Sequence, residues 1–157
     1  MELSDRIEEA VNRLDQKSSN AIDEAWSELR PLGFGVVPYL RAAYPRFRQS
    51  AGRCALVYYS VRYARIGTDA VELGLAALGD RAKIVRYRAC GLLAYSLNLK
   101  ALAPLVAMQD DPDSLVRSSA EAAVLAIRHG NHHLFVDRDL SGRSFWHVNP
   151  GDERSGA

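Results

Sequence analysis

The sequence predicts an all-α protein: a short solenoid of antiparallel helix pairs that ends in a C-terminal β-hairpin cap. Three observations predict this fold. Residues 71–128 contain an internal repeat with a period of 31 residues. Apolar residues recur at helical spacing along most of the chain, and glycine or proline interrupts them at short intervals. After Gly130 the helical spacing gives way to aromatic and β-branched residues around a Ser-Gly pair.

The internal repeat becomes visible when the first of its two units is moved forward by 31 positions. Asp80 then falls on Asp111 and Arg86 on Arg117, and apolar positions on both sides coincide as well. A self-match with a period of about 20 to 50 residues is typical of a solenoid, whose unit cannot bury its apolar face alone. The repeat therefore predicts the architecture and leaves the partner open.

Four helices are expected in the first half of the chain, at residues 4–14, 20–32, 36–44 and 47–65. Ser4 and Asn20 are suitable N-caps for the first two. Gly33 breaks the second helix, and Pro45 ends the third because proline disfavours the helical conformation at the residue before it.

Four more helices are expected in the second half, at residues 68–78, 81–97, 99–109 and 112–129. Gly79 and Gly130 fit the position just beyond a helix end. Asp111 is a good N-cap because Pro112 would then occupy the first helical position. The pattern predicts helix pairs joined by short turns.

The end of the chain is expected to differ from the repeats. We assign residues 1–130 to the helical repeat domain, 131–148 to a β-hairpin packed on the last repeat, and 149–157 to a flexible tail. The hairpin would bury Phe135 and one of Phe145 or Trp146, since a terminal repeat leaves an apolar face without a neighbour.

The two repeat units resemble HEAT-like repeats, in particular the bacterial type named after the phycobilisome lyases. The resemblance rests on Asp80 followed by VRYRA at 85–89, and on Asp111 followed by VRSSA at 116–120. It implies that each Asp lies in a turn and bonds along the stack to an Arg from the start of a helix. In the earlier units both Arg48 and Arg53 are candidates for the repeat Arg.

Charge is distributed unevenly along the chain. Residues 41–100 hold eleven bases and three acids, a net charge of +8, although the whole chain has a net charge of only +1. A basic centre indicates an acidic partner, or charges that serve neighbouring repeats. Cys54 and Cys90 fall in apolar helical patterns and are expected to be buried free thiols. No signal peptide or membrane span is recognisable, so we expect a cytoplasmic protein.

No motif of a catalytic, metal or cofactor site stands out. Residues 137–142 are similar to the first half of a calcium loop, but Val148 stands where the closing Glu belongs, so a turn is favoured. His129, His132, His133 and His147 lack the fixed spacing of metal ligands, and we favour surface and helix-end roles for them. The sequence thus predicts that the chain is not an enzyme and needs no cofactor.

Tyrosine and arginine are concentrated in the basic centre, and both residue types anchor protein interfaces. Helical-wheel positions single out a candidate partner-binding surface, although the repeat arginines and several tyrosines could serve only the packing of the helices. The candidate surface comprises Tyr39, Arg41, Tyr59, Arg62, Lys83, Tyr87 and Arg88.

Two functions follow from the resemblance and the charge. The first is a noncatalytic protein-binding module with an acidic partner, because small bacterial HEAT-like proteins include immunity or regulatory partners of toxins. The alternative is nucleic-acid binding, as in the HEAT-like alkylpurine DNA glycosylases. A role beside a chromophore lyase would rest on the name of the repeat alone.

Overall fold

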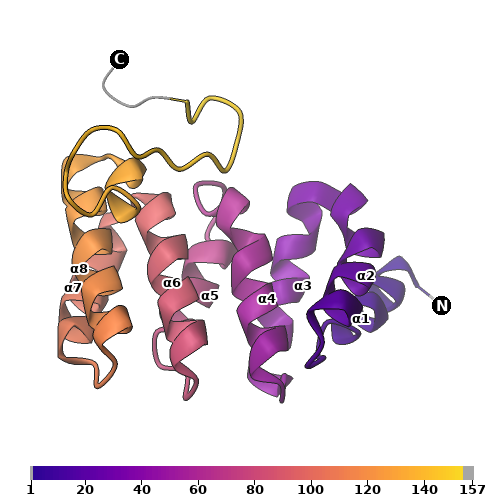
Figure 1. Cartoon of the computed structure of the whole chain (residues 1–157). Helices are drawn as coiled ribbons and strands as arrows, with labels where there is room; N and C mark the ends of the chain where they lie inside the picture. Colours follow the sequence, from indigo (N-terminus) through magenta and orange to yellow (C-terminus); the bar gives the residue numbers. More distant parts are fainter. Residues whose placement is uncertain (1, 154–157) are drawn as a thin grey trace.

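The computed structural model describes residues 2–153, which form a two-layered row of helices (Figure 1). One layer holds the odd-numbered helices and the other the even-numbered ones, because α4 packs against α2 and α6, and α6 packs against α8. The eight α-helices of the described chain are α1 (Leu3–Asn12), α2 (Ser19–Leu29), α3 (Val37–Ala43), α4 (Ser50–Ser60), α5 (Asp69–Ala77), α6 (Lys83–Ser96), α7 (Leu102–Ala107) and α8 (Ser114–His129).

Short 3-10 turns extend or join several of these helices. They are η1 (Arg30–Val36), η2 (Tyr44–Arg46), η3 (Val61–Tyr63), η4 (Leu99–Ala101), η5 (Met108–Asp110) and η6 (His132–Phe135). The chain is thus a helical repeat protein with a solenoid-like fold, as the periodicity predicts.

Local signals set several helix ends. The Asp113 side chain accepts a hydrogen bond from the Val116 amide at 3.1 Å and caps α8, so the cap is two residues later than the sequence predicts. Gly130, with φ of 61°, ends the same helix in the left-handed conformation that glycine adopts without strain. The predicted helix 47–65 is shorter, since α4 begins at Ser50 and gives way to η3.

Ion pairs between adjacent repeats hold the stack in register. Arg53 donates to Asp80 through Nε at 2.8 Å and Nη2 at 3.1 Å, and Arg86 makes the same two bonds to Asp111 at 2.9 and 3.2 Å. The Nη1 group of Arg86 also donates to the Asp80 carbonyl, and that of Arg117 to the Asp111 carbonyl. We call these contacts the Arg–Asp ladder. Its first Arg is Arg53, which decides between the two candidates left open by the sequence.

The predicted β-hairpin cap is wrong, because residues 2–153 contain no strand. Asn131 caps η6 instead, its side-chain oxygen accepting from the His133 amide at 3.1 Å, so the chain turns where a strand was expected. Residues 136–153, which we call the strap, then run back over the ends of α8, α6 and α4 (Figure 1). The aromatic residues of the strap pack on helices and not on a second strand.

The loop at the start of the strap is held by one buried carboxylate. Asp137 accepts from the Ser141 amide and hydroxyl at 3.1 and 2.7 Å and from the Gly142 amide at 2.7 Å. Residues 149–153 belong to the segment expected to be flexible, and Asn149 and Asp152 there bond to Tyr95. The rest of that segment, 154–157, lies outside the described residues.

Candidate functional site

A pocket of about 560 Å³ opens on the side of the even-numbered helices. Helices α2, α4 and α6, the turns η3 and η6 and the strap all contribute to it. We call this pocket the groove. Its lining residues are Trp26, Arg30, Tyr58, Tyr59, Val61, Arg62, Tyr63, Tyr87, Arg88, Gly91, Phe135, Trp146, His147 and Val148.

Aromatic rings form most of the groove wall. Trp26 and Tyr59 stack face to face, with centroids 4.0 Å apart, and Tyr58 meets Tyr59 edge-on. Trp26 is buried, whereas Tyr58 is 56% exposed and is the most accessible aromatic side chain in the groove. Burial and a hydrogen bond to Asp23 raise the pKa of Tyr59 to about 12, so its hydroxyl is a neutral donor at neutral pH.

A second aromatic group closes the groove at its C-terminal end. Phe135 and Trp146 lie with centroids 5.4 Å apart, and Tyr87 lies 6.4 Å from Phe135. Gly91 of α6 lies beneath them, because a β-carbon built there would lie 3.4 Å from the Phe135 ring and 3.8 Å from Trp146. These distances are ordinary van der Waals contacts, so the two rings pack directly over α6 at this residue.

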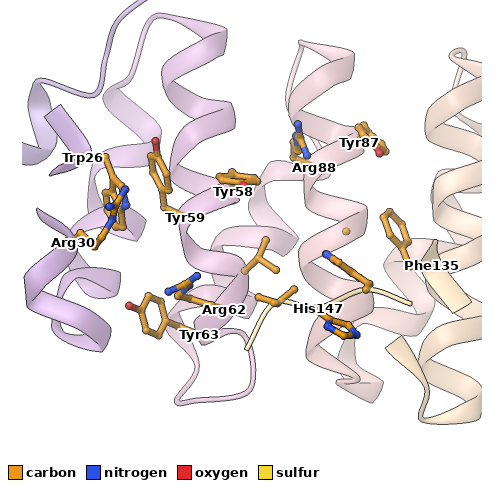
Figure 2. A pocket seen from close by; sticks show the side chains of 14 residues that line it. Trp26, Arg30, Tyr58, Tyr59, Arg62, Tyr63, Tyr87, Arg88, Phe135 and His147 are labelled. Carbon is orange, nitrogen blue, oxygen red and sulfur yellow. The ribbon is translucent and has the colours of Figure 1, made fainter. Parts of the chain in front are cut away.

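Three arginines stand at separate places around the groove. Figure 2 shows Arg30 beside Trp26, Arg62 beside Tyr63, and Arg88 near Tyr58. The Arg88 guanidinium lies 5.3 Å from the centre of the Tyr58 ring, within cation–π range. Among residues 2–153 none of these three groups has a carboxylate within ion-pair distance. The groove therefore offers separated positive charges to a ligand.

The structure brings four of the seven predicted surface residues together in the groove, namely Tyr59, Arg62, Tyr87 and Arg88. The other three lie elsewhere. Tyr39 packs against the core, Arg41 bonds Asp69 at 2.9 Å, and Lys83 lies 3.6 Å from Asp113.

Much of the basic charge predicted for partner binding is already paired with acids. Five of the eleven bases in residues 41–100 form ion pairs, namely Arg41, Arg53, Lys83, Arg86 and Lys100. The net charge of residues 41–100 thus overstates the basic charge that is left without an ion pair in the described structure, and Arg62 and Arg88 of the groove belong to that remainder.

Sequence reasoning missed several groove residues: Trp26, Arg30, Tyr58, Trp146 and His147. Trp26 is buried, and it lines the groove as well. The strap residues were assigned to a hairpin, so nothing in the pattern placed them beside α4.

The histidines weighed as metal ligands do not gather into a ligand group within residues 2–153. Within the described part of the chain no three His, Cys, Asp or Glu side chains lie where they could hold a metal ion. Cys54 and Cys90 are free thiols, and burial raises the pKa of Cys90 to about 12, which keeps it protonated. No helix within residues 2–153 is long and apolar enough to cross a membrane.

Neither the known family models nor the curated proteins contain a match to this chain. Among solved structures it is similar to human deoxyhypusine hydroxylase in complex with glycerol, with a TM-score of 0.60 and 21% identity. The match covers 82% of this chain and 48% of that one, so the chain spans about half the length of its structural neighbour.

The comparison corrects one prediction. At 21% identity the likeness shows the fold alone, which is an array of paired helices. The expectation that the chain is not an enzyme is contradicted, because a solved protein that shares the fold is a hydroxylase. The helical-repeat fold gives no ground for excluding catalysis.

Proposed function

We propose that this chain is a HEAT-like, protein-binding scaffold whose groove receives an extended, acidic segment of a partner protein. The observation that carries the proposal is the set of Arg30, Arg62 and Arg88, which are spaced around an aromatic pocket and have no carboxylate at ion-pair distance among residues 2–153. Because the guanidinium groups are separated, they suit several carboxylates along a peptide better than one compact anion. A toxin or other protein with an acidic surface is a partner of this kind.

The size and composition of the groove support a peptide as the occupant. About 560 Å³ lies within the range of about 300–1,000 Å³ that ligand pockets have. Exposed Tyr58 between Arg62 and Arg88 provides rigid contact area flanked by directional donors, which is the composition of interface hot spots. The free thiols also suit a reducing compartment, and we propose the cytoplasm.

A peptide selection tests this function directly. We expect a random peptide library displayed on phage to yield Asp- and Glu-rich segments with an aromatic or apolar residue. The variant Arg62→Glu with Arg88→Glu should lose these peptides while its circular dichroism stays helical. Association with the wild-type chain should slow as salt rises, because exposed charges steer the encounter.

A matched control separates the groove from the total charge. Arg48→Glu with Arg81→Glu changes the net charge equally at two exposed sites outside the groove, and it should retain the peptides. Neutral selected peptides, or equal binding to the folded groove variant, would refute the proposal. Tight binding of DNA at physiological salt, lost in the groove variant alone, would favour nucleic-acid binding.

A further inference from the structure

The strap is fastened to the helices by two adjacent buried histidines. His133 Nδ1 accepts a hydrogen bond from the Trp146 amide at 2.8 Å. His132 Nε2 lies 2.8 Å from the Trp146 carbonyl oxygen. Both backbone groups of one strap residue are therefore held by imidazole nitrogens, and the Trp146 ring packs against Phe135 and Tyr95 beside them.

The partners of His132 fix its protonation state. Arg65 Nη2 lies 3.0 Å from His132 Nδ1, and a guanidinium can only donate, so Nδ1 must be an unprotonated acceptor. The proton of the neutral ring is then on Nε2, where it is donated to the Trp146 carbonyl. A second proton on Nδ1 would remove the acceptor and place a cation against Arg65.

The same reasoning applies to His133. Its Nδ1 accepts from the Trp146 amide, so a proton there would break this bond. The centroids of the two imidazole rings lie 4.0 Å apart, and two imidazolium charges at that distance repel each other. The complete set of strap contacts therefore requires that both histidines are neutral.

Some of the other charged and titratable groups around the two histidines disfavour a positive charge on them, and others favour it. Arg65 faces the pair from the turn after η3, and His147 faces His133 from the strap; both disfavour a positive charge on the pair. Asp152 lies 4.0 Å from His132 Nε2 and favours a positive charge on His132. Asp152 also accepts from the Tyr95 hydroxyl and from the Val148 and Asn149 amides, which disperses its charge. Asp137 is likewise occupied by its own loop.

We propose that His132 and His133 form a pH-sensitive latch, whose protonation releases the strap and opens the C-terminal end of the groove. Trp146, His147 and Val148 all line the groove, so release removes one wall of it. The proposal concerns regulation of the same groove, and its second consequence, a pH-dependent ligand affinity, rests on the proposed function.

The direction of the pH effect follows from linkage. Burial, with the neighbouring positive charges, holds the pKa of both His132 and His133 below the ordinary value of about 6.5. Release of the strap exposes both rings to water and raises their pKa towards that ordinary value, so acidification favours release. The latch is complete above about pH 6.5 and is lost as the pH falls below it.

Trp146 fluorescence measures release without any ligand. In a Trp26→Phe background Trp146 is the one remaining tryptophan, because the chain contains two. Acidification from about pH 8 to about pH 5 should give a red shift and a severalfold rise in quenching by acrylamide, while circular dichroism stays helical. Unchanged quenching across this range in the folded protein would overturn the proposal.

A non-titrating variant tests the histidines themselves. In His133→Asn the amide oxygen replaces the accepting Nδ1, and in His132→Gln the amide nitrogen replaces the donating Nε2. The double variant should keep Trp146 shielded from acrylamide at both pH values. The control His129→Gln, at an exposed helix end, should release Trp146 on acidification as the parent does. If the strap of the double variant is released at every pH, nitrogen-15 spectra of the parent test the proposal instead. Protonation of the histidines and loss of protection at the Trp146 amide must then occur with the same pH midpoint.

Peptide binding provides the separate second readout. The affinity of a selected acidic peptide should differ between about pH 7.5 and about pH 5.5 in the parent and not in the double variant. Release without peptide binding at either pH would retain the latch and refute the proposed function. Peptide binding without release of the strap would retain the proposed function and refute the latch.

Discussion

The backbone at Gly52 approaches another segment so closely that a side chain does not fit. A β-carbon at this position in α4 would lie 2.7 Å from the Leu14 carbonyl oxygen and 3.0 Å from the Asp15 Cα. Both of these are backbone atoms, which cannot move aside as a flexible side chain would. The requirement for glycine here comes from packing.

Gly52→Ala should therefore lower the free energy of unfolding by about 1–3 kcal/mol, although alanine is the better helix former. Urea unfolding measures the difference. Gly35→Ala is the matched control, because no atom lies within 4 Å of its β-carbon position, and it should be close to neutral. A stabilising Gly52→Ala would show that α4 can shift away from Leu14.

The two complete pairs of the Arg–Asp ladder differ in burial, so their contributions to the free energy of unfolding should differ as well. Arg53 and Asp80 have side chains 5% and 3% exposed, and Arg86 and Asp111 14% and 5%. Asp80→Ala would leave a buried guanidinium without its carboxylate and should cost about 3–5 kcal/mol, whereas Asp111→Ala should cost about 1–3 kcal/mol. Urea unfolding of both variants tests this order.

The exposed Arg41–Asp69 pair serves as the reference. Asp69→Ala should cost at most about 1 kcal/mol, since surface ion pairs contribute little. If all three substitutions cost the same, burial does not determine the strength of the ladder.

The ladder also predicts how stability responds to acid. Burial would raise the pKa of Asp80, but hydrogen bonds from Arg53, Tyr44 and the Ala82 amide outweigh it and leave the pKa below its ordinary value. As the pH falls, the unfolded chain therefore takes up its proton first. The stabilisation by Asp80 is present above about pH 4 and is lost as the pH falls through the lowered folded-state pKa.

Unfolding at several pH values measures this loss. The difference in unfolding free energy between wild type and Asp80→Asn should be largest near about pH 6 and shrink towards about pH 3. If the difference in unfolding free energy does not change with pH, the ionised Asp80 carboxylate does not stabilise the fold.

At the residue scale the sequence identified the ladder but only part of the groove. Asp80 and Arg86 were found because each recurs 31 positions later, and repetition is visible without coordinates. Tyr58 was missed because it lies outside the repeat of residues 71–128 and follows directly on the buried Val57. Its exposure depends on where α4 stands between α2 and α6.

At the scale of elements, the strap shows the limit of pattern reasoning. Aromatic residues around a Ser-Gly pair indicate a hairpin when their partners lie on a second strand. Here the partners are Phe135 and Tyr95, and the backbone of Trp146 bonds to histidine side chains. An extended segment fastened to helices has the same local composition as a strand.

Tyr95 is the second fastening point of the strap, and its removal should loosen it. The buried Tyr95 hydroxyl donates to Asp152 at 2.7 Å and accepts from Asn149 at 3.0 Å. Tyr95→Phe should therefore lower the free energy of unfolding by about 1–3 kcal/mol. Protease cleavage should move into residues 143–153, as mass spectrometry of the fragments would show.

Tyr63→Phe is a suitable control, because this tyrosine borders the groove without a hydrogen bond to the strap in the described structure. Wild-type resistance to protease in Tyr95→Phe would show that the histidines hold the strap alone.

At the scale of the whole molecule, the sequence predicted the stack but not the groove. The order of helices follows from apolar spacing and from glycine and proline, which act over a few residues. The groove is lined by residues far apart in the chain, from Trp26 to Val148. They come together only because successive repeats pack at particular angles. Those angles depend on side-chain packing such as the stacked Trp26 and Tyr59 rings.

The strap also supports only part of the helical array. Asn149 donates to the Arg62 carbonyl at 2.8 Å, so the strap ties the end of α8 to η3 across α6. Among the described residues no hydrogen bond joins it to α1, α2 or α3. The N-terminal wall of the groove is therefore joined to α4 by the stacked Trp26 and Tyr59 rings and by the Tyr59–Asp23 hydrogen bond, whereas the strap supports only the C-terminal wall.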